Sequence, residues 1–150
     1  MAELICYGKT VSLEEFIQLQ VLSNRGTSTR IQIGDLQYAV GELGIEYKKT
    51  ATKKELLNLL FEYYKDAGKV AQTLGIGVQV NQYIEAFPLL TKADIKRLER
   101  FEILKVVGYQ QYRAYGKYLY ATLYDVEQFL NMTEKDMRIL LEQYPKGKRR

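Results

Sequence analysis

Histidine is missing from all 150 residues of the chain. It is the side chain that most often transfers protons near neutral pH, and it is a common zinc ligand. Its absence excludes histidine general-base catalysis, Ser-His-Asp triads and the usual zinc ligand sets. No glycine-rich phosphate loop of the GxxxxGK[ST] or GxGxxG type occurs either. The sequence therefore predicts a non-catalytic protein with no cofactor and no metal.

Cysteine is almost absent as well, since Cys6 is the one cysteine in the chain. A single thiol cannot form an intramolecular disulfide framework or a thiolate metal site, and it fits a reducing compartment. No apolar run approaches the ~20 residues that a membrane-spanning helix requires, and the apolar stretch at 4–6 is too short for a signal peptide. We therefore expect a soluble, cytoplasmic protein that has no membrane partner.

Acidic residues are missing from one stretch, residues 103–124, and six of the chain's thirteen tyrosines lie there, between Tyr109 and Tyr124. An aromatic strip without carboxylates suits a nucleic-acid surface, because bases stack on aromatic rings and carboxylates repel phosphates. Tyrosine is also enriched at protein–protein interfaces, and some of these rings can belong to the core. The pattern alone leaves these three roles open.

Positive charge is concentrated at the end of the chain. The net charge is +4, but four of the 22 basic residues lie in the last six positions, which leaves 18 basic and 18 acidic residues in the rest. Any charged surface on this neutral body must therefore arise from the distribution of charge. The tail is either a solvated chain end or an arm that contacts phosphates, which would add salt-sensitive affinity without sequence information.

Helix starts are the clearest positive signal in the sequence. A Ser or Thr followed three residues later by a carboxylate forms a capping box, which satisfies two backbone N–H groups at the start of a helix. Such pairs precede segments with helical apolar spacing at Ser12/Glu15, Thr52/Glu55, Thr91/Asp94 and Thr133/Asp136. Asp35 and Asp125 are the predicted caps of two shorter helices, at 36–43 and 126–130. The chain is therefore predicted to be mainly helical.

The one convincing β signal lies at 105–124, where β-branched and aromatic residues are frequent. Gly116 is the predicted turn of a β-hairpin. Alternation along the second strand predicts one face with Leu119, Ala121 and Leu123, and another with Tyr118, Tyr120, Thr122 and Tyr124.

Two stretches that contain glycine, at 24–29 and 67–69, are predicted to be loosely structured joints. These joints and the start of the basic tail divide the chain into four parts. We expect an N-terminal helical segment at 1–26, a helical lobe at 27–68, a second unit at 76–144 and a basic tail at 145–150.

The predicted elements between about residues 80 and 131 follow one another in an informative order. A short helix at 81–87, a turn and a basic helix at 91–101 precede the hairpin, and a closing helix follows it. This order, with its motif residues, resembles the MerR-type and excisionase-type winged helix-turn-helix. The matching residues are Thr91, Ile95, Arg97, Leu98, Glu99, Ile103, Leu104, Val106, Asp125, Val126, Glu127, Phe129 and Leu130.

This resemblance implies that the helix at 91–101 enters the major groove of DNA, where arginine can reach guanine edges or phosphates. The basic side chains expected on its outer face are Lys92, Lys96, Arg97 and Arg100. In the hairpin, contacts with nucleic acid are expected from Tyr112, Arg113, Tyr115 and Lys117, with Tyr109 and Tyr118 as further stacking candidates. The alternative interpretation of the helix is an ordinary solvated amphipathic face.

Residues 33–64 resemble a second family, the SAP/HeH helix-extended loop-helix. The matching residues are Leu36, Leu43, Gly44, Ile45, Thr52, Lys53, Glu55, Leu56, Leu59 and Leu60. In such modules the loop and the start of the second helix meet the DNA backbone, where helix N-terminal amides favour phosphate. The resemblance thereby implicates Lys48, Lys49, Lys53 and Lys54. A solvated loop is the alternative.

The expected fold is mainly α with a small β-hairpin: a helix-extended loop-helix lobe followed by a winged helix-turn-helix. The expected function is non-catalytic binding of DNA, with RNA as a second candidate, by a small phage or mobile-element regulator of transcription. The alternative is a protein-interaction adaptor or virion component whose Tyr109–Tyr124 hairpin binds a protein. The segment at 133–144 either forms a homodimer or packs on its own core. If the chain binds DNA, we expect the basic residues of 48–54 and 92–100 on one continuous face.

Overall fold

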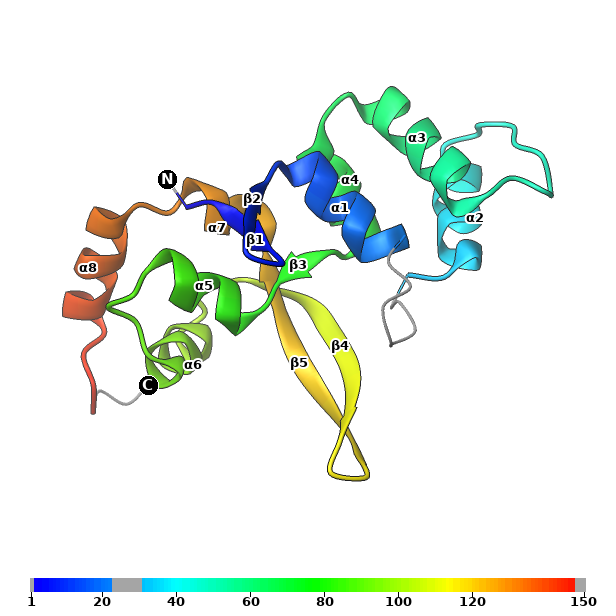
Figure 1. Ribbon diagram of the computed structural model, residues 1–150. Helices are drawn as coiled ribbons and strands as arrows, with labels where there is room; N and C mark the ends of the chain where they lie inside the picture. The colour runs from blue at the N-terminus through cyan, green and yellow to red at the C-terminus, as the bar shows by residue number, and fades with distance from the viewer. Residues whose placement is uncertain (1, 23–30, 148–150) are drawn as a thin grey trace.

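The computed structural model of the chain describes residues 2–22 and 31–147 (Figure 1). Within these residues the chain forms eight helices and two small antiparallel sheets. The expectation of a mainly helical chain with a small β-hairpin is confirmed at this level. No helix in the described part is long and apolar enough to cross a membrane.

The N-terminal residues form a β-hairpin of strands β1 (Leu4–Cys6) and β2 (Lys9–Val11). Tyr7 (φ 52°) and Gly8 (φ 77°) make its two-residue turn, and positive φ at both positions matches the twist of a hairpin. The expected helical segment at 1–26 is therefore wrong over residues 4–11. The expectation failed because strands of three residues carry almost no alternation pattern.

Helix α1 (Leu13–Leu22) begins as expected, since the Ser12 hydroxyl accepts a hydrogen bond from the Glu15 backbone N–H at 3.1 Å. Helices α2 (Ile33–Glu42) and α3 (Lys53–Tyr64) are joined by the extended segment 43–52. The capping box predicted at the start of α3 is confirmed. The cap predicted for α2 is wrong, because α2 begins earlier, at Ile33, with Gln32 in the N-cap position. Asp35 is its third residue and accepts from the Gln32 N–H at 2.7 Å.

The stretch predicted as a joint at 67–69 is instead the start of helix α4 (Ala67–Leu74), capped by Asp66. Gly68 is buried there against α7 (Val126–Asn131), and a Cβ at this position would stand 1.8 Å from the Glu127 Oε1 atom. The glycine therefore allows close packing of two helices and does not mark a flexible link. The other predicted joint, at 24–29, lies outside the described residues.

The predicted hairpin is confirmed as strands β4 (Val106–Ala114) and β5 (Lys117–Asp125), with Tyr115 (φ 54°) and Gly116 (φ 71°) in the turn. A short strand that was not predicted, β3 (Gly77–Val78), pairs with the base of β5, so the sheet order is β3-β5-β4. A Cβ on Gly77 would lie 2.5 Å from the Tyr124 carbonyl oxygen. Only glycine lets β3 approach β5 this closely.

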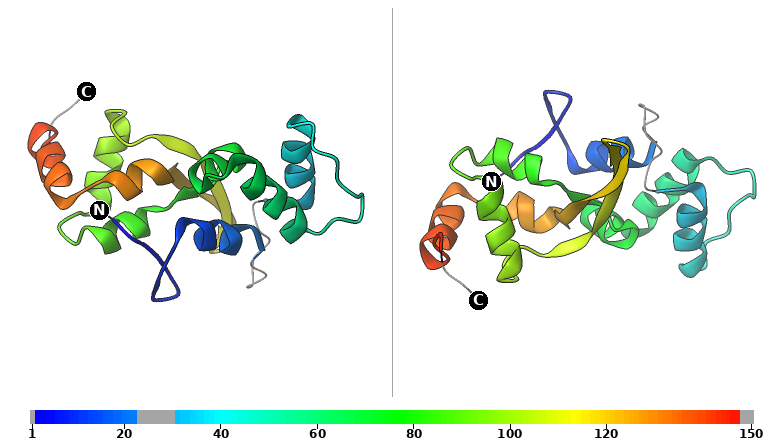
Figure 2. Two further views of the ribbon diagram at one scale, coloured as in Figure 1. Left: turned by 90° about the horizontal axis from the view of Figure 1, so that it is seen from above. Right: turned by 90° about the horizontal axis from the view of Figure 1, so that it is seen from below.

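The remaining helices flank this sheet. They are α5 (Val80–Ala86), α6 (Lys92–Arg100), α7 and α8 (Glu134–Gln143). The capping boxes predicted at the starts of α6 and α8 and the Asp125 cap of α7 are all confirmed. In both figures α2 and α3 lie at one end of an elongated molecule, α6 and α8 lie at the other, and the β4–β5 hairpin projects from the middle (Figure 2).

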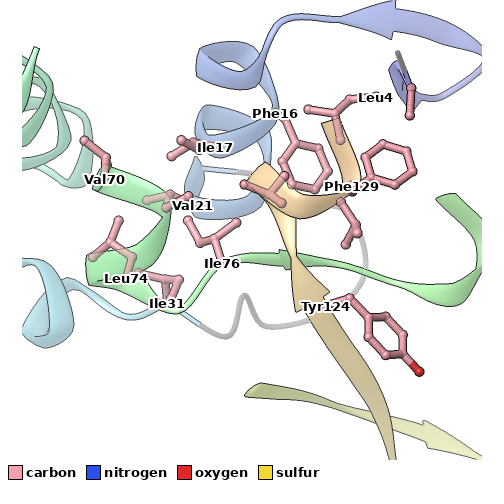
Figure 3. Close-up of a cluster of buried hydrophobic side chains, with 14 of the residues drawn as sticks. Leu4, Phe16, Ile17, Val21, Ile31, Val70, Leu74, Ile76, Tyr124 and Phe129 are labelled. Atoms are coloured by element: carbon pink, nitrogen blue, oxygen red, sulfur yellow. The ribbon is translucent and has the colours of Figure 1, made fainter. Parts of the chain in front are cut away.

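One continuous buried cluster holds these parts together. Its side chains come from the N-terminal hairpin, from α1 and α4, and from β5 and α7 (Figure 3). Tyr83, Tyr124 and Phe129 form an aromatic group within the cluster, where the Tyr83 ring lies edge-on to Phe129 with 4.9 Å between centroids. The base of the β4–β5 hairpin is thus anchored in the core, and its outer part stands free.

Candidate nucleic-acid interface

Helix α6 carries a basic stripe on its exposed side. Lys92, Lys96 and Arg100 are spaced four residues apart, which places them on one face of a helix, and all three are exposed. Ile95 and Leu98 turn the other way and are completely buried. Three of the four basic residues expected on the outer face of this helix therefore lie there.

Arg97 is the exception, and its expected place on the outer face is wrong. Only 5% of the residue is exposed. Its Nη2 atom lies 2.7 Å from Oδ1 of Asp94, and its Nε–H donates to the Tyr144 carbonyl oxygen at 2.7 Å. Residue 97 is turned by about 100° from Lys96 around the helix, toward the end of α8. Arg97 thus fastens α6 to the segment after α8, and it is not available to read bases.

Two side-chain contacts attach α6 to the hairpin. The Lys96 ammonium donates to the Thr122 hydroxyl at 3.2 Å and lies 3.4 Å from Oε1 of Glu99. The Tyr124 hydroxyl donates to the same Glu99 oxygen at 2.5 Å. Burial, followed by the neighbouring carboxylate of Glu99, raises the pKa of Tyr124 well above its ordinary value, so this hydroxyl stays a donor at neutral pH. The basic stripe and the hairpin therefore form one connected surface.

The strand register divides the projecting part of the hairpin into two faces. Directly opposed residues share a face, and Thr122, which bonds Lys96, identifies the face turned toward α6. We call this the α6-side face; it comprises Tyr109, Gln111, Arg113, Tyr118, Tyr120 and Thr122. The opposite face comprises Gln110, Tyr112, Ala114, Lys117, Leu119 and Ala121.

This division separates the hairpin residues that were predicted together. Arg113 lies on the α6-side face, where its guanidinium carbon is 5.7 Å from the centre of the Tyr118 ring. Tyr112 and Lys117 lie on the opposite face, and Tyr115 stands 98% exposed in the turn. Tyr109 and Tyr112 likewise lie on different faces, because side chains three residues apart on a strand point to opposite faces.

Tyr120 is the residue that the sequence argument did not choose as a contact. It is 65% exposed and lies on the α6-side face between Tyr118 and Thr122. The alternation predicted for this strand already grouped Tyr120 with Tyr118, and the register confirms that grouping. The α6-side face thus carries three exposed rings, those of Tyr109, Tyr118 and Tyr120.

The two carboxylates of α6 are engaged by neighbouring groups. Asp94 pairs with Arg97, and Glu99 is held between Lys96 and Tyr124. Burial acts to raise the pKa of Asp94, but hydrogen bonds from Thr91 and Arg97 outweigh it, so that the pKa lies below its ordinary value. Residues 103–124 contain no carboxylate. The surface formed by the stripe and the α6-side face is therefore favourable to a polyanion.

The lysines of the 48–54 segment lie elsewhere. Lys53 is used internally, where its ammonium donates to the Ile31 and Val21 carbonyl oxygens at 2.8 and 3.3 Å. Lys48, Lys49 and Lys54 are exposed, but the segment lies at the opposite end of the molecule from α6 (Figures 1 and 2). The expectation of one continuous face with residues 92–100 is wrong, because α1 and α4 stand between the two regions.

A hollow of about 400 Å³ is lined by α2, α4 and the end of α3. Its rim carries the carboxylates of Asp35 and Glu42 beside the rings of Tyr38 and Tyr64, and no lysine or arginine lines it. Such a rim repels phosphate. This hollow is therefore no candidate for a nucleic-acid site.

In the described part of the chain, no three Cys, Asp or Glu residues are grouped to hold a metal ion. Of the expected basic tail, residues 148–150 lie outside the described residues.

Comparisons with family models, curated proteins and solved structures find no match to the chain. The surface formed by α6 and the hairpin is thus what carries a functional argument.

Proposed function

We propose that the protein is a non-catalytic DNA-binding protein that uses α5, α6 and the β4–β5 hairpin as a winged helix-turn-helix. In this proposal α6 enters the major groove, and the hairpin contacts the neighbouring backbone. The observation that carries it is the continuity of the basic stripe with the α6-side face through the Lys96–Thr122 hydrogen bond. The resemblance of residues 80–131 to the MerR-type and excisionase-type winged helix-turn-helix supports, as part of this proposal, a role as a small phage or mobile-element regulator of transcription.

The dimensions of α6 support this arrangement. A helix with its side chains is about 10–12 Å across, and the major groove of B-DNA is about 12 Å wide. Residues four apart on a helix rise by about 6 Å, so the stripe covers roughly 12 Å along the groove. The Arg97 bonds to Asp94 and Tyr144 fix the buried side of α6. The stripe is therefore carried by a helix whose position is held by its packing.

The test compares two triple variants with the same loss of charge. Replacement of Lys92, Lys96 and Arg100 by alanine is expected to weaken duplex binding at low salt by roughly 30-fold or more, because three phosphate or base contacts disappear. The control replaces Lys9, Lys69 and Lys135, which are exposed lysines of β2, α4 and α8. Its binding should change less than threefold. Equal losses in the two variants, or no binding by the unaltered chain, contradict the proposal.

The exposed lysines of the far end supply a second, weaker contact in this proposal. Lys48, Lys49 and Lys54 lie at the opposite end of the molecule from α6 (Figures 1 and 2). Their joint replacement by alanine is therefore expected to weaken binding to a 40-base-pair duplex and to leave binding to a 15-base-pair duplex unchanged. The same loss on both lengths contradicts a separate contact.

A second candidate function, a protein-interaction adaptor, is favoured by the opposite face of the hairpin. Tyr112 and Leu119 are direct cross-strand neighbours there, and they are 43% and 36% exposed. Apolar and aromatic side chains of this kind form the centres of protein interfaces. The adaptor hypothesis predicts that Leu119→Asp abolishes association with a protein partner, including a second copy of the chain, without changing retention on DNA. Loss of DNA retention alone contradicts it.

A further inference from the structure

We infer that the α6-side face of the hairpin binds unpaired bases, so that the preferred ligand is a duplex joined to a single strand. This inference rests on the proposed function, in which α6 takes the duplex. In the winged-helix proposal the α6-side face contacts only the DNA backbone. The inference adds unpaired bases as a second class of ligand for the same face.

The three rings on this face are exposed, and the Arg113 guanidinium carbon lies 5.7 Å from the centre of the Tyr118 ring. Tyr109, Tyr118 and Tyr120 are 58%, 65% and 65% exposed. In the described part of the chain none of them packs against another aromatic ring. Their position on the free part of the hairpin gives them no role in the buried cluster. A flat β surface with exposed tyrosines is a platform on which bases of any sequence can stack.

The spacing of the rings selects unpaired bases over a duplex. Tyr118 and Tyr120 are two residues apart on β5, which separates their side chains by about 6.8 Å. Tyr109 is the diagonal cross-strand neighbour of Tyr120, at roughly 7–8 Å. Bases stacked in a duplex rise by about 3.4 Å and cover one another's faces. Only bases that have left the stack can each meet one ring of this row.

The charges form a path for the backbone of the strand. Lys96 lies at the base of the ring row, bonded to Thr122, which is directly opposite Tyr109. Arg113 lies toward the turn, directly opposite Tyr118. No carboxylate interrupts residues 103–124. A strand leaving a duplex held by α6 would therefore pass Lys96 first, then the rings, then Arg113.

A protein partner is the less suitable occupant of this face. Association there would cover Arg113 and Lys96, whose charges must then be desolvated or paired. The opposite face of the hairpin offers the cross-strand pair Tyr112 and Leu119, and Lys117, next to the turn, is its one charged residue. The two faces thus suit different ligands, and the face that adjoins the basic stripe suits nucleic acid.

The test measures fluorescence anisotropy of the full chain with three labelled DNA probes: a blunt 20-base-pair duplex, the same duplex with an eight-nucleotide single-stranded tail, and the single strand alone. The unaltered chain is expected to bind the tailed duplex at least tenfold more tightly than the blunt one, since each stacked base contributes roughly fivefold or more. The double variant Tyr118→Leu with Tyr120→Leu should lose this gain, so that its affinities for the tailed and the blunt duplex become equal.

The control variant is Tyr112→Leu, which removes an exposed ring from the opposite face and should keep the tenfold gain. Equal affinity of the unaltered chain for tailed and blunt duplexes overturns the inference and leaves the proposed function standing. No binding to any probe at low salt overturns the proposed function itself, and the inference falls with it. A double variant that keeps the gain but loses self-association would show that the rings serve a protein contact, which also overturns the inference.

Discussion

Arg97 shows that a shift of one position along α6 changes what a basic side chain does. Its neighbour Lys96 points to solvent and to the hairpin, while Arg97 is buried between Asp94 and the Tyr144 carbonyl group. A charged group in such a place is tolerated because its partners are close and well oriented. Its contribution is to stability, since it joins α6 to the end of α8.

Replacement of Arg97 by alanine is therefore expected to lower the free energy of unfolding by about 3 kcal/mol, because Asp94 and the Tyr144 carbonyl lose a buried donor. Lys92→Ala should change stability by less than about 0.5 kcal/mol, as an exposed substitution. Urea unfolding measures both variants. An Arg97→Ala protein as stable as the unaltered chain would contradict the structural role.

The two buried tyrosines of the core differ in one hydrogen bond. The Tyr124 hydroxyl donates to Glu99, whereas the buried Tyr83 hydroxyl has no partner within the described residues. Tyr124→Phe should destabilise the protein by about 1–2 kcal/mol, because a bond to a charged acceptor is lost. Tyr83→Phe should leave stability unchanged or raise it by up to about 1 kcal/mol, since it removes an unsatisfied hydroxyl. Thermal or urea unfolding that ranks the variants in the reverse order contradicts this account.

Two capping aspartates make the fold sensitive to acid. Hydrogen bonds from the Thr133 hydroxyl and N–H lower the pKa of Asp136. Burial acts to raise the pKa of Asp94, but the hydrogen bonds from Thr91 and Arg97 bring it below its ordinary value. A pKa that is lower in the folded state than in the unfolded one means that the unfolded state binds more protons. This stabilisation is complete above the ordinary carboxyl pKa of about 4, and it is lost as the pH falls through the lower folded value.

We therefore expect the urea midpoint to fall between about pH 5 and pH 2. Asp94→Asn should be less stable at pH 6 and should lose less stability over that interval, because one of the two shifted groups no longer titrates. The substitution Asp136→Asn removes the other shifted carboxylate. It should likewise lower stability at pH 6 and reduce the loss of stability over that interval. Parallel pH profiles for the unaltered chain and Asp94→Asn contradict this assignment.

At the scale of elements, the start of a helix could be predicted from sequence where its capping residues lie within three positions of each other. The capping boxes of α3, α6 and α8 depend on residues three apart, and each was predictable. The hairpin β4–β5 was predictable because nine-residue strands carry visible alternation. Its division into an α6-side face and an opposite face required the register and the contact with α6.

The elements that sequence did not reveal depend on distant partners. Strand β3 has two residues and exists because it pairs with β5, more than 40 residues later in the chain. Helix α4 contains Gly68, which in isolation disfavours a helix, yet α4 forms because Val70, Ala71 and Leu74 are buried in the core. The burial of Arg97 likewise depends on Tyr144, 47 residues away. Such contacts leave no periodic pattern in the sequence.

Two glycine substitutions distinguish a glycine that close packing requires from one that only lowers helix propensity. Gly77→Ala should lower the free energy of unfolding by about 2 kcal/mol or more, because its Cβ would meet the Tyr124 carbonyl oxygen and force β3 away from β5. Gly41→Ala, in α2, meets no atom within 4 Å and should raise stability by about 0.5–1 kcal/mol through helix propensity. Equal effects of the two substitutions in urea unfolding contradict the close pairing of β3.

At the scale of the whole molecule, the two basic regions predicted to contact DNA, residues 48–54 and 92–100, lie at different ends. The 43–52 segment lies at one end, and the stripe of α6 lies at the other, next to the projecting hairpin (Figure 1). A single continuous core connects them, so the distance between the two ends is fixed by packing. Sequence could identify both basic regions, but their separation follows from how α1 and α4 fill the middle.

The salt dependence of duplex binding tests the central claim most directly. If Lys92, Lys96 and Arg100 neutralise phosphates, the affinity of the unaltered chain should fall steeply between about 50 and 200 mM salt, and the plot of log affinity against log salt should be linear. The triple alanine variant should show a slope smaller by about 2–3 units, close to one unit per contact removed. An unchanged slope in that variant, or an affinity that does not depend on salt, would contradict binding of DNA through α6.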